Sequence, residues 1–224
     1  MEVLPQRSRN DYFLKQISRS ESKFQYCKVS FSHVYKYRRI LLRLGVPEPK
    51  KILCLGTRNG REVDIFRQVF LGRGIGRLPQ LFEVKKFGWR PLVPWFERLG
   101  RNKLDVTSDR TAIGVEINPH GQRSDVLVAS FDELPPQWTS MFDLVYSNSL
   151  DQSMNPNRSA REWLRVLKPG GTIIVGFDGR QPTDSDPTGS LVIGDISSLF
   201  PGNLRFYEEN HSNYHDAIIT IPTA

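Results

Sequence analysis

From residue 50 onward, segments with the apolar pattern of strands alternate with segments that have the apolar spacing of helices. The first strand-like run, Lys51–Leu55, reads KILCL, and residues 61–70 follow with apolar side chains at helical spacing. This alternation is typical of a parallel sheet covered by helices. The other expected strands are 111–117, 125–129, 142–147, 172–177, 204–208 and 217–221, and the other expected helices are 160–167 and 193–200. The chain is therefore predicted to be an α/β protein with a seven-stranded, mostly parallel sheet and helices on both faces.

Two parts of the chain fall outside this pattern. Residues 1–49 form a basic lead-in, in which one helix is expected over 31–44. Residues 71–110 separate the first helix from the second strand, although such connections usually take only a few residues. Because this insertion is rich in large apolar side chains, it is expected to form an ordered cap. The predicted organisation is a helical extension over 1–49 and one domain over 50–224 that contains the insertion.

Charge is distributed unevenly along the sequence. Residues 1–50 contain 11 Lys and Arg against 4 Asp and Glu, residues 51–110 contain 13 against 6, and the remainder contains 7 against 14. A basic front half indicates either a surface for anionic partners such as nucleic acid or phosphorylated metabolites, or a solvated basic face without a dedicated partner. Composition alone leaves both interpretations open.

Several classes of protein are disfavoured by what the sequence lacks. No apolar run approaches the ~18 residues needed to cross a bilayer, and residues 1–10 lack the apolar core of a secretory signal. Two cysteines, Cys27 and Cys54, cannot by themselves make a disulfide framework or a zinc site. A cytoplasmic protein without a metal centre is therefore expected.

Polar and glycine-rich motifs follow four of the predicted strands. A glycine turn, 56–60, comes after the first strand, and Glu116 lies at the end of the second. Ser130 begins a polar stretch after the third strand, and Ser147 ends the fourth. Open α/β sheets bind ligands at the carboxyl ends of their strands, and an acid at the tip of the second strand can accept from both hydroxyls of a ribose. Such an acid can instead cap a neighbouring helix, so a structural role for Glu116 stays open.

In this order, the motifs resemble a known family. The segments ILCLGTRNG, GVEINP, VASFDELP, FDLVYSNSLDQS and LRVLKPGGTIIV are similar to the motifs of class I S-adenosylmethionine-dependent methyltransferases. The resemblance implies a three-layer Rossmann-like fold and S-adenosylmethionine as the cofactor. It also implies the cofactor-binding residues: Gly56, Thr57 and Gly60 under the methionine moiety, Glu116 at the ribose, Ile117, Ser130, Phe131 and Asp132 around the adenine, and Ser147 and Asn148 beside the methyl donor.

Three positions depart from the pattern of that family. Cys54 stands where relatives commonly have an acid, and Arg58 stands where they have a third glycine. The loss of the acid weakens the expected hold on the cofactor's amino group, for which Glu62, one turn into the helix, is a candidate substitute. Gln152 stands where relatives often have a histidine that acts as a base.

Methyl transfer from a sulfonium is an in-line displacement, to which a protein contributes mainly alignment and the exclusion of water. A base is required only if the acceptor is a hydroxyl or a protonated amine, and Asp151, with His215 behind it, is the candidate. The favoured acceptor is a small molecule or a glycan. The alternatives are a nucleic-acid or protein methyltransferase that uses the basic front half, and a non-catalytic binding protein on the same fold. A nicotinamide enzyme fits less well, because no Gly-x-Gly-x-x-Gly motif follows the first strand.

Overall fold

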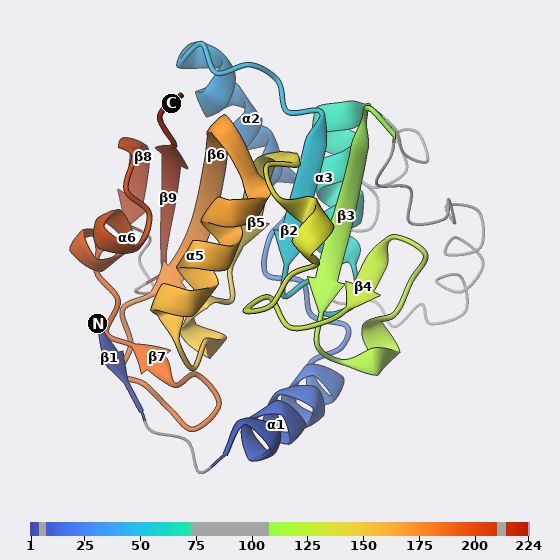
Figure 1. Cartoon of the computed structure of the whole chain (residues 1–224), viewed down its shortest axis with the longest axis vertical. Helices are drawn as coiled ribbons and strands as arrows, with labels where there is room; N and C mark the ends of the chain where they lie inside the picture. Colours follow the sequence, from blue (N-terminus) through green and yellow to red (C-terminus); the bar gives the residue numbers. More distant parts are fainter. Residues whose placement is uncertain (5–7, 73–107, 210–213, 224) are drawn as a thin grey trace.

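The computed structural model describes residues 1–4, 8–72, 108–209 and 214–223 (Figure 1). Most of the insertion over 71–110, including the expected cap, lies outside the described residues. None of the described helices is long and apolar enough to cross a membrane.

A seven-stranded sheet with the order β4-β3-β2-β5-β6-β9-β8 forms the centre of the molecule. The first five strands in this order are parallel, whereas β9 runs antiparallel to both β6 and β8. Along the chain, β3 and β4 are added on one side of β2, and β5 is then added on the other side. The order in which strands are added therefore reverses between β2 and β5. The strands are β2 (Lys51–Leu55), β3 (Thr111–Glu116), β4 (Val126–Val128), β5 (Phe142–Ser147), β6 (Leu167–Asp178), β8 (Asn203–Glu209) and β9 (Tyr214–Thr220).

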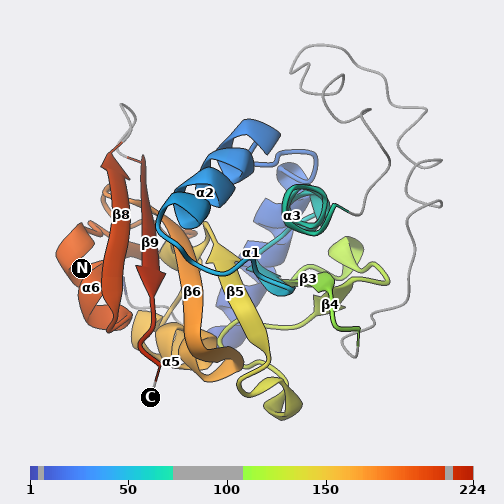
Figure 2. The same ribbon diagram turned by 90° about the horizontal axis from the view of Figure 1, so that it is seen from above.

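Helices cover both faces of this sheet, which confirms the predicted fold class. Figure 2 shows α2 (Phe31–Arg43) and α3 (Arg61–Leu71) on one side and α5 (Pro156–Val166) on the other. Alternate residues of β2 point to the two layers. Leu53 and Leu55 pack in the cluster that includes α5 and α6 (Ile193–Leu199), and Ile52 and Cys54 pack in the cluster with α2 and α3. In the part of the chain that the structure describes, three short 3-10 helices complete the connections: η2 (Pro119–Gly121), η3 (Pro136–Trp138) and η4 (Leu150–Gln152).

Two predicted boundaries need correction. Helix α5 begins at Pro156 rather than at residue 160, because the Asn155 side chain caps it by accepting from the Arg158 amide at 3.0 Å. Strand β6 begins at Leu167 rather than at residue 172. The Lys-Pro-Gly-Gly turn is thus part of an irregular start of the strand, where the register with β5 shifts.

The sequence pattern missed one helix, α1 (Arg9–Ser22), which lies across the carboxyl ends of the parallel strands (Figure 1). Its buried residues are Tyr12, Gln16 and Ser20, four positions apart along one face. The Ser8 side chain accepts from the amide of Asp11 and so caps the start of the helix. A small antiparallel sheet of β1 (Glu2–Val3) and β7 (Thr188–Gly189) lies beside it.

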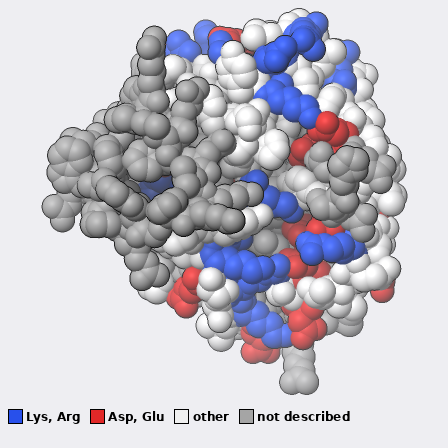
Figure 3. All heavy atoms as spheres, turned by 180° about the vertical axis from the view of Figure 1, so that it is seen from behind, with Lys and Arg blue, Asp and Glu red and all other residues white. Residues whose placement is uncertain are grey.

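Some charges of the two halves of the sequence meet each other among the described residues. Four basic residues of the extension form ion pairs with acids of the C-terminal half: Arg9 with Glu133, Lys15 with Asp184, Arg19 with Asp186, and Lys36 with Glu208. Figure 3 shows Lys and Arg side chains interspersed with acidic and uncharged surface on the face it draws. The uneven charge along the sequence therefore does not become a uniformly basic surface over the described residues of this face.

Candidate functional site

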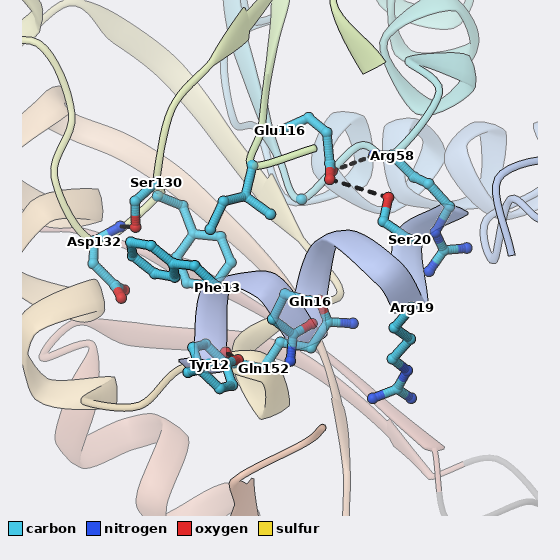
Figure 4. A pocket seen from close by; sticks show the side chains of 13 residues that line it. Tyr12, Phe13, Gln16, Arg19, Ser20, Arg58, Glu116, Ser130, Asp132 and Gln152 are labelled. Carbon is cyan, nitrogen blue, oxygen red and sulfur yellow. Dashed lines mark hydrogen bonds between the residues drawn. The ribbon is translucent and has the colours of Figure 1, made fainter. Parts of the chain in front are cut away.

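A pocket lies at the carboxyl ends of β2, β3 and β4, with α1 as its cover (Figure 4). The pocket is narrow, with about 40 Å³ of free space. Residues from both the sheet edge and α1 line it: Tyr12, Phe13, Gln16, Arg19, Ser20, Gly56, Arg58, Glu116, Ile117, Ser130, Phe131, Asp132 and Gln152. Helix α1 therefore forms one wall of the pocket.

The pocket brings together six of the residues that the sequence predicted for the cofactor: Gly56, Glu116, Ile117, Ser130, Phe131 and Asp132. The other four, Thr57, Gly60, Ser147 and Asn148, do not line it. Ser147 and Asn148 are buried at the end of β5, where the Ser147 hydroxyl donates to the Leu55 carbonyl at 3.1 Å. Gly60 precedes α3 with a positive φ of 75°. Most of the predicted set thus lies at one sheet edge, with Ser147 and Asn148 deeper than expected.

Glu116 holds three parts of the site together. One carboxylate oxygen accepts from the Arg58 amide at 2.6 Å. The other accepts from the Asn118 amide at 3.0 Å and from the Ser20 hydroxyl at 3.2 Å, as the dashed lines in Figure 4 indicate in part. The structural role that the sequence left open for this acid is therefore present. The Ser20 hydroxyl also occupies the kind of position that a ribose hydroxyl would take.

The glycine turn keeps a conformation that a ligand-binding loop needs, despite Arg58. Gly56 has a φ of +72°, and a Cβ added to it would lie 2.6 Å from the Ser149 hydroxyl oxygen. Arg58 itself has a positive φ of 52°, so the chain follows a glycine-like path with a residue that disfavours it. The Arg58 guanidinium donates to the Tyr26 carbonyl at 2.9 Å and so points away from the turn. The loop therefore accommodates Arg58 at a position where the family has a glycine.

The side of the pocket formed by Phe131 and Asp132 is supported from α5. The Trp163 indole donates to the Phe131 carbonyl at 3.2 Å, and the two rings meet edge to face at 5.7 Å. Asp132 accepts a hydrogen bond from the Ser159 hydroxyl, and burial raises the pKa of this carboxyl while that bond opposes the shift. Phe13 points from α1 towards Ser130 and Asp132 (Figure 4).

At the end of β2 and the start of α3, Cys54 is fully buried in the core and Glu62 supplies a carboxylate nearby. One oxygen of Glu62 accepts from the Asn148 amide at 2.9 Å, and the other is buried without a partner in the described part of the chain. Burial raises the pKa of Glu62 to about 7, and the bond from Asn148 opposes this. The buried Thr57 hydroxyl also lacks a partner among the described residues. Unsatisfied acceptors beside a glycine turn fit a ligand with a cationic group.

The two predicted catalytic residues lie in different surroundings. Asp151 in η4 is buried with one oxygen unpartnered among the described residues, and burial raises its pKa to about 7, with Asp186 adding to the shift. His215 in β9 bonds through Nδ1 to the Tyr207 hydroxyl at 3.0 Å and stacks on Phe177. The described residues show no hydrogen bond between Asp151 and His215, so their joint role stays a prediction.

Sequence reasoning missed the contribution of α1 to the site. Tyr12 donates through its hydroxyl to the Gln152 carbonyl, and Arg19 pairs with Asp186. The available signal was a polar one, since Gln16 and Ser20 repeat at the spacing of a helical face. An apolar stripe, which is the usual helix signal, is absent from that face.

Comparison with known proteins adds to this geometry. Residues 93–175 match the family model of a methyltransferase domain. A chain of the complex between the Haloferax volcanii Trm112 methyltransferase activator and a methyltransferase is 16% identical, with a TM-score of 0.58 over 97% of this chain and 99% of that one. Burkholderia thailandensis 1,6-didemethyltoxoflavin-N1-methyltransferase, solved with S-adenosylhomocysteine, is 11% identical, with a TM-score of 0.58 over 98% and 92% of the two chains. The [4+2]-cyclase SpnF is 14% identical, with a TM-score of 0.55 over 99% and 98%. No curated protein matches the sequence of this chain.

The described fold is Rossmann-like, as it is in these structural neighbours. Over residues 93–175 the chain is similar to a methyltransferase domain, in keeping with the resemblance of its motifs to those of class I S-adenosylmethionine-dependent methyltransferases.

Proposed function

We propose that the protein transfers the methyl group of S-adenosylmethionine to a small molecule or a glycan. The cofactor would lie under α1, with Glu116 at the ribose, Ile117 and Phe131 at the adenine, and the turn at Gly56 along the sulfonium side. Asp151 would serve as the base if the acceptor needs one, since its pKa of about 7 suits proton transfer near neutral pH.

The observation that carries this proposal is the cover that α1 places over the sheet edge. Tyr12 and Gln16 of this helix bond to carbonyls of the loops after β5 and β6, at Gln152 and Ser185, so the helix is tied down on two sides. A covered site excludes water and suits an acceptor that enters as a whole, whereas a polymer needs an open surface. The Burkholderia neighbour acts on a small heterocycle, which is consistent with this choice.

Among the described residues, some basic residues of the extension pair with acids of the same chain, which favours the small-molecule proposal over the nucleic-acid alternative. Arg9 and Lys36, for example, bond to Glu133 and Glu208. The non-catalytic alternative rests on Cys54 and Arg58, and the fold alone does not decide it, since a cyclase shares the architecture.

Incubation with S-adenosylmethionine labelled on its methyl group, together with an extract of cells, tests the acceptor class. We expect enzyme-dependent label in the low-molecular-mass fraction. In parallel, RNA binding should be weak at physiological salt. Label confined to RNA or protein would contradict the proposal, as would tight RNA binding whose log–log salt slope is about −0.7 per phosphate contacted.

A further inference from the structure

The replacement of an acid by Cys54 leaves the cofactor's amino group without its usual partner in the family. The methionine moiety of the cofactor carries an ammonium group, and an ammonium group in a covered site is costly unless it is paired. Cys54 is fully buried, and burial raises the pKa of its thiol well above the usual value, so it offers no negative charge. If the site binds this cofactor, another group must balance the ammonium.

Glu62 brings a carboxylate to the same neighbourhood from a different element. It lies in the first turn of α3, directly after the glycine turn, and the Coulombic effect of its carboxylate is the second cause, after burial, of the raised pKa of Cys54. The Glu62–Asn148 hydrogen bond of 2.9 Å joins the start of α3 to the end of β5. This hydrogen bond therefore spans the point between β2 and β5 where the order of added strands reverses. Open α/β sheets bind their ligands at such points.

The hydrogen bonding of Glu62 leaves one carboxylate oxygen without a partner among the described residues. Its side chain is almost fully buried, one oxygen is satisfied by Asn148, and the other has no partner among the described residues. The two cations whose charges act on it are engaged elsewhere. The Arg58 guanidinium donates to main-chain carbonyls, and the Lys28 ammonium lies 3.5 Å from the centre of the Tyr214 ring. A buried, unsatisfied carboxylate oxygen is costly, and a ligand ammonium group would remove that cost.

We propose that Glu62 binds the ammonium group of the cofactor's methionine moiety and so replaces the strand acid that Cys54 displaces. Asn148 orients the carboxylate through its bond to the first oxygen, and the free oxygen accepts from the ammonium. This inference rests on the proposed position of the cofactor at the β2–β5 edge.

The competing explanation is structural: Glu62 would serve only to hold Asn148 and the loop after β5. The two roles separate with a ligand that lacks the amino-acid portion. S-adenosylhomocysteine carries the ammonium group, whereas 5′-methylthioadenosine has the same adenosine and thioether without it. Glu62→Gln keeps the size of the side chain and the oxygen that accepts from Asn148, but it removes the charge.

The experiment is calorimetric titration of the full chain and of Glu62→Gln with both ligands. We expect Glu62→Gln to weaken S-adenosylhomocysteine by roughly tenfold or more, the effect of one charge-assisted hydrogen bond, and to leave 5′-methylthioadenosine within about twofold. Asp64→Asn is the matched control, since it removes an exposed acid from the same helical turn and should change neither affinity.

Equal weakening of both ligands would mean that Glu62 only supports the loop, and no change in either would mean that it does not contact the cofactor. Both results overturn the inference while leaving the proposed function in place. If the unmodified chain binds neither ligand, the proposed function itself fails and this inference fails with it.

Discussion

The two sides of the site follow the pattern of the family to different degrees. On the adenosine side, Glu116, Ile117 and Phe131 line the pocket at the positions that the motifs predict. On the methionine side, the strand acid is replaced by Cys54, and the buried carboxylate nearby belongs to Glu62 on α3. The adenosine side has the residues that the family motifs predict. The methionine side has a carboxylate, but on a helix and not on the strand.

The difference reflects what each side has to recognise. Two neighbouring ribose hydroxyls require acceptors in a fixed arrangement, which in the proposed complex the tip of β3 would supply through both oxygens of Glu116. An ammonium group donates in several directions, so a carboxylate can approach it from a strand or from a helix. We therefore expect the adenosine side to tolerate substitution less well than the methionine side.

The largest effect is expected for Glu116→Ala. If Glu116 accepts from both ribose hydroxyls, its loss removes two charge-assisted hydrogen bonds, each worth about 1.5–3 kcal/mol. Affinity for S-adenosylhomocysteine and for 5′-methylthioadenosine should then fall by at least about a hundredfold in calorimetry. Glu133→Ala, at an exposed acid of the next loop, is the control. An unchanged dissociation constant would return Glu116 to a purely structural role.

The pH dependence of the free energy of unfolding should report on Glu62, the carboxylate on the methionine side. Burial raises the pKa of Glu62 from 4.5 to about 7, so the folded chain holds this proton more tightly than the unfolded chain does. The contribution of Glu62 to the free energy of unfolding is therefore largest below about pH 4.5 and falls by about 3 kcal/mol as the pH rises to about 7.

Denaturant unfolding across this pH range, without ligand, provides the measurement. Glu62→Gln should flatten the decline, and Asp151→Asn should do so independently, because burial also raises the pKa of Asp151 to about 7. Asp64→Asn should keep the slope of the unmodified chain. A slope that is the same in Glu62→Gln as in the unmodified chain would contradict the buried, unpaired carboxylate.

The glycine turn joins the two sides, and Gly56→Ala tests its geometry. Alanine at this position has an unfavourable positive φ, and its Cβ would also collide with the Ser149 side chain. Gly45→Ala is matched in φ, at +69°, but its Cβ meets nothing within 4 Å. We expect losses in the free energy of unfolding of about 3 kcal/mol for Gly56→Ala and about 1 kcal/mol for Gly45→Ala. Equal losses would show that the Ser149 contact yields without cost.

The smallest effect is expected for substitution of Ser20 in α1, the helix that covers the pocket. The Ser20 hydroxyl donates to Glu116 in the structure, so a ribose would have to displace it. Ser20→Ala should therefore raise the affinity for S-adenosylhomocysteine by about threefold, whereas Ser22→Ala, at an exposed serine of the same helix, should have no effect. Weaker binding by Ser20→Ala would show that this hydroxyl contacts the cofactor instead.

Much of the sheet was predictable because its strands are short apolar runs that end in turn residues. Lys51–Leu55 and Phe142–Ser147 have the predicted bounds. The helix α1 escaped prediction because it covers a polar site, so its buried face carries Tyr12, Gln16 and Ser20 in place of an apolar stripe.

Site residues were predictable where they belong to one local motif. They were less predictable where residues far apart in the sequence contact one another. Glu116 lies at a strand tip, which is a local signal. The bond between Glu62 and Asn148 joins residues 86 positions apart, and the contact between Ser20 and Glu116 joins residues 96 apart. No local pattern records such pairs, because they depend on how the strands order in the sheet.

We propose that the pocket at the carboxyl ends of β2, β3 and β4 binds S-adenosylmethionine. Calorimetry of the unmodified chain with S-adenosylmethionine, S-adenosylhomocysteine and NAD tests it most directly. We predict saturable binding of both sulfur ligands and much weaker binding of NAD. Tighter binding of NAD, or no binding of either sulfur ligand, would contradict the account.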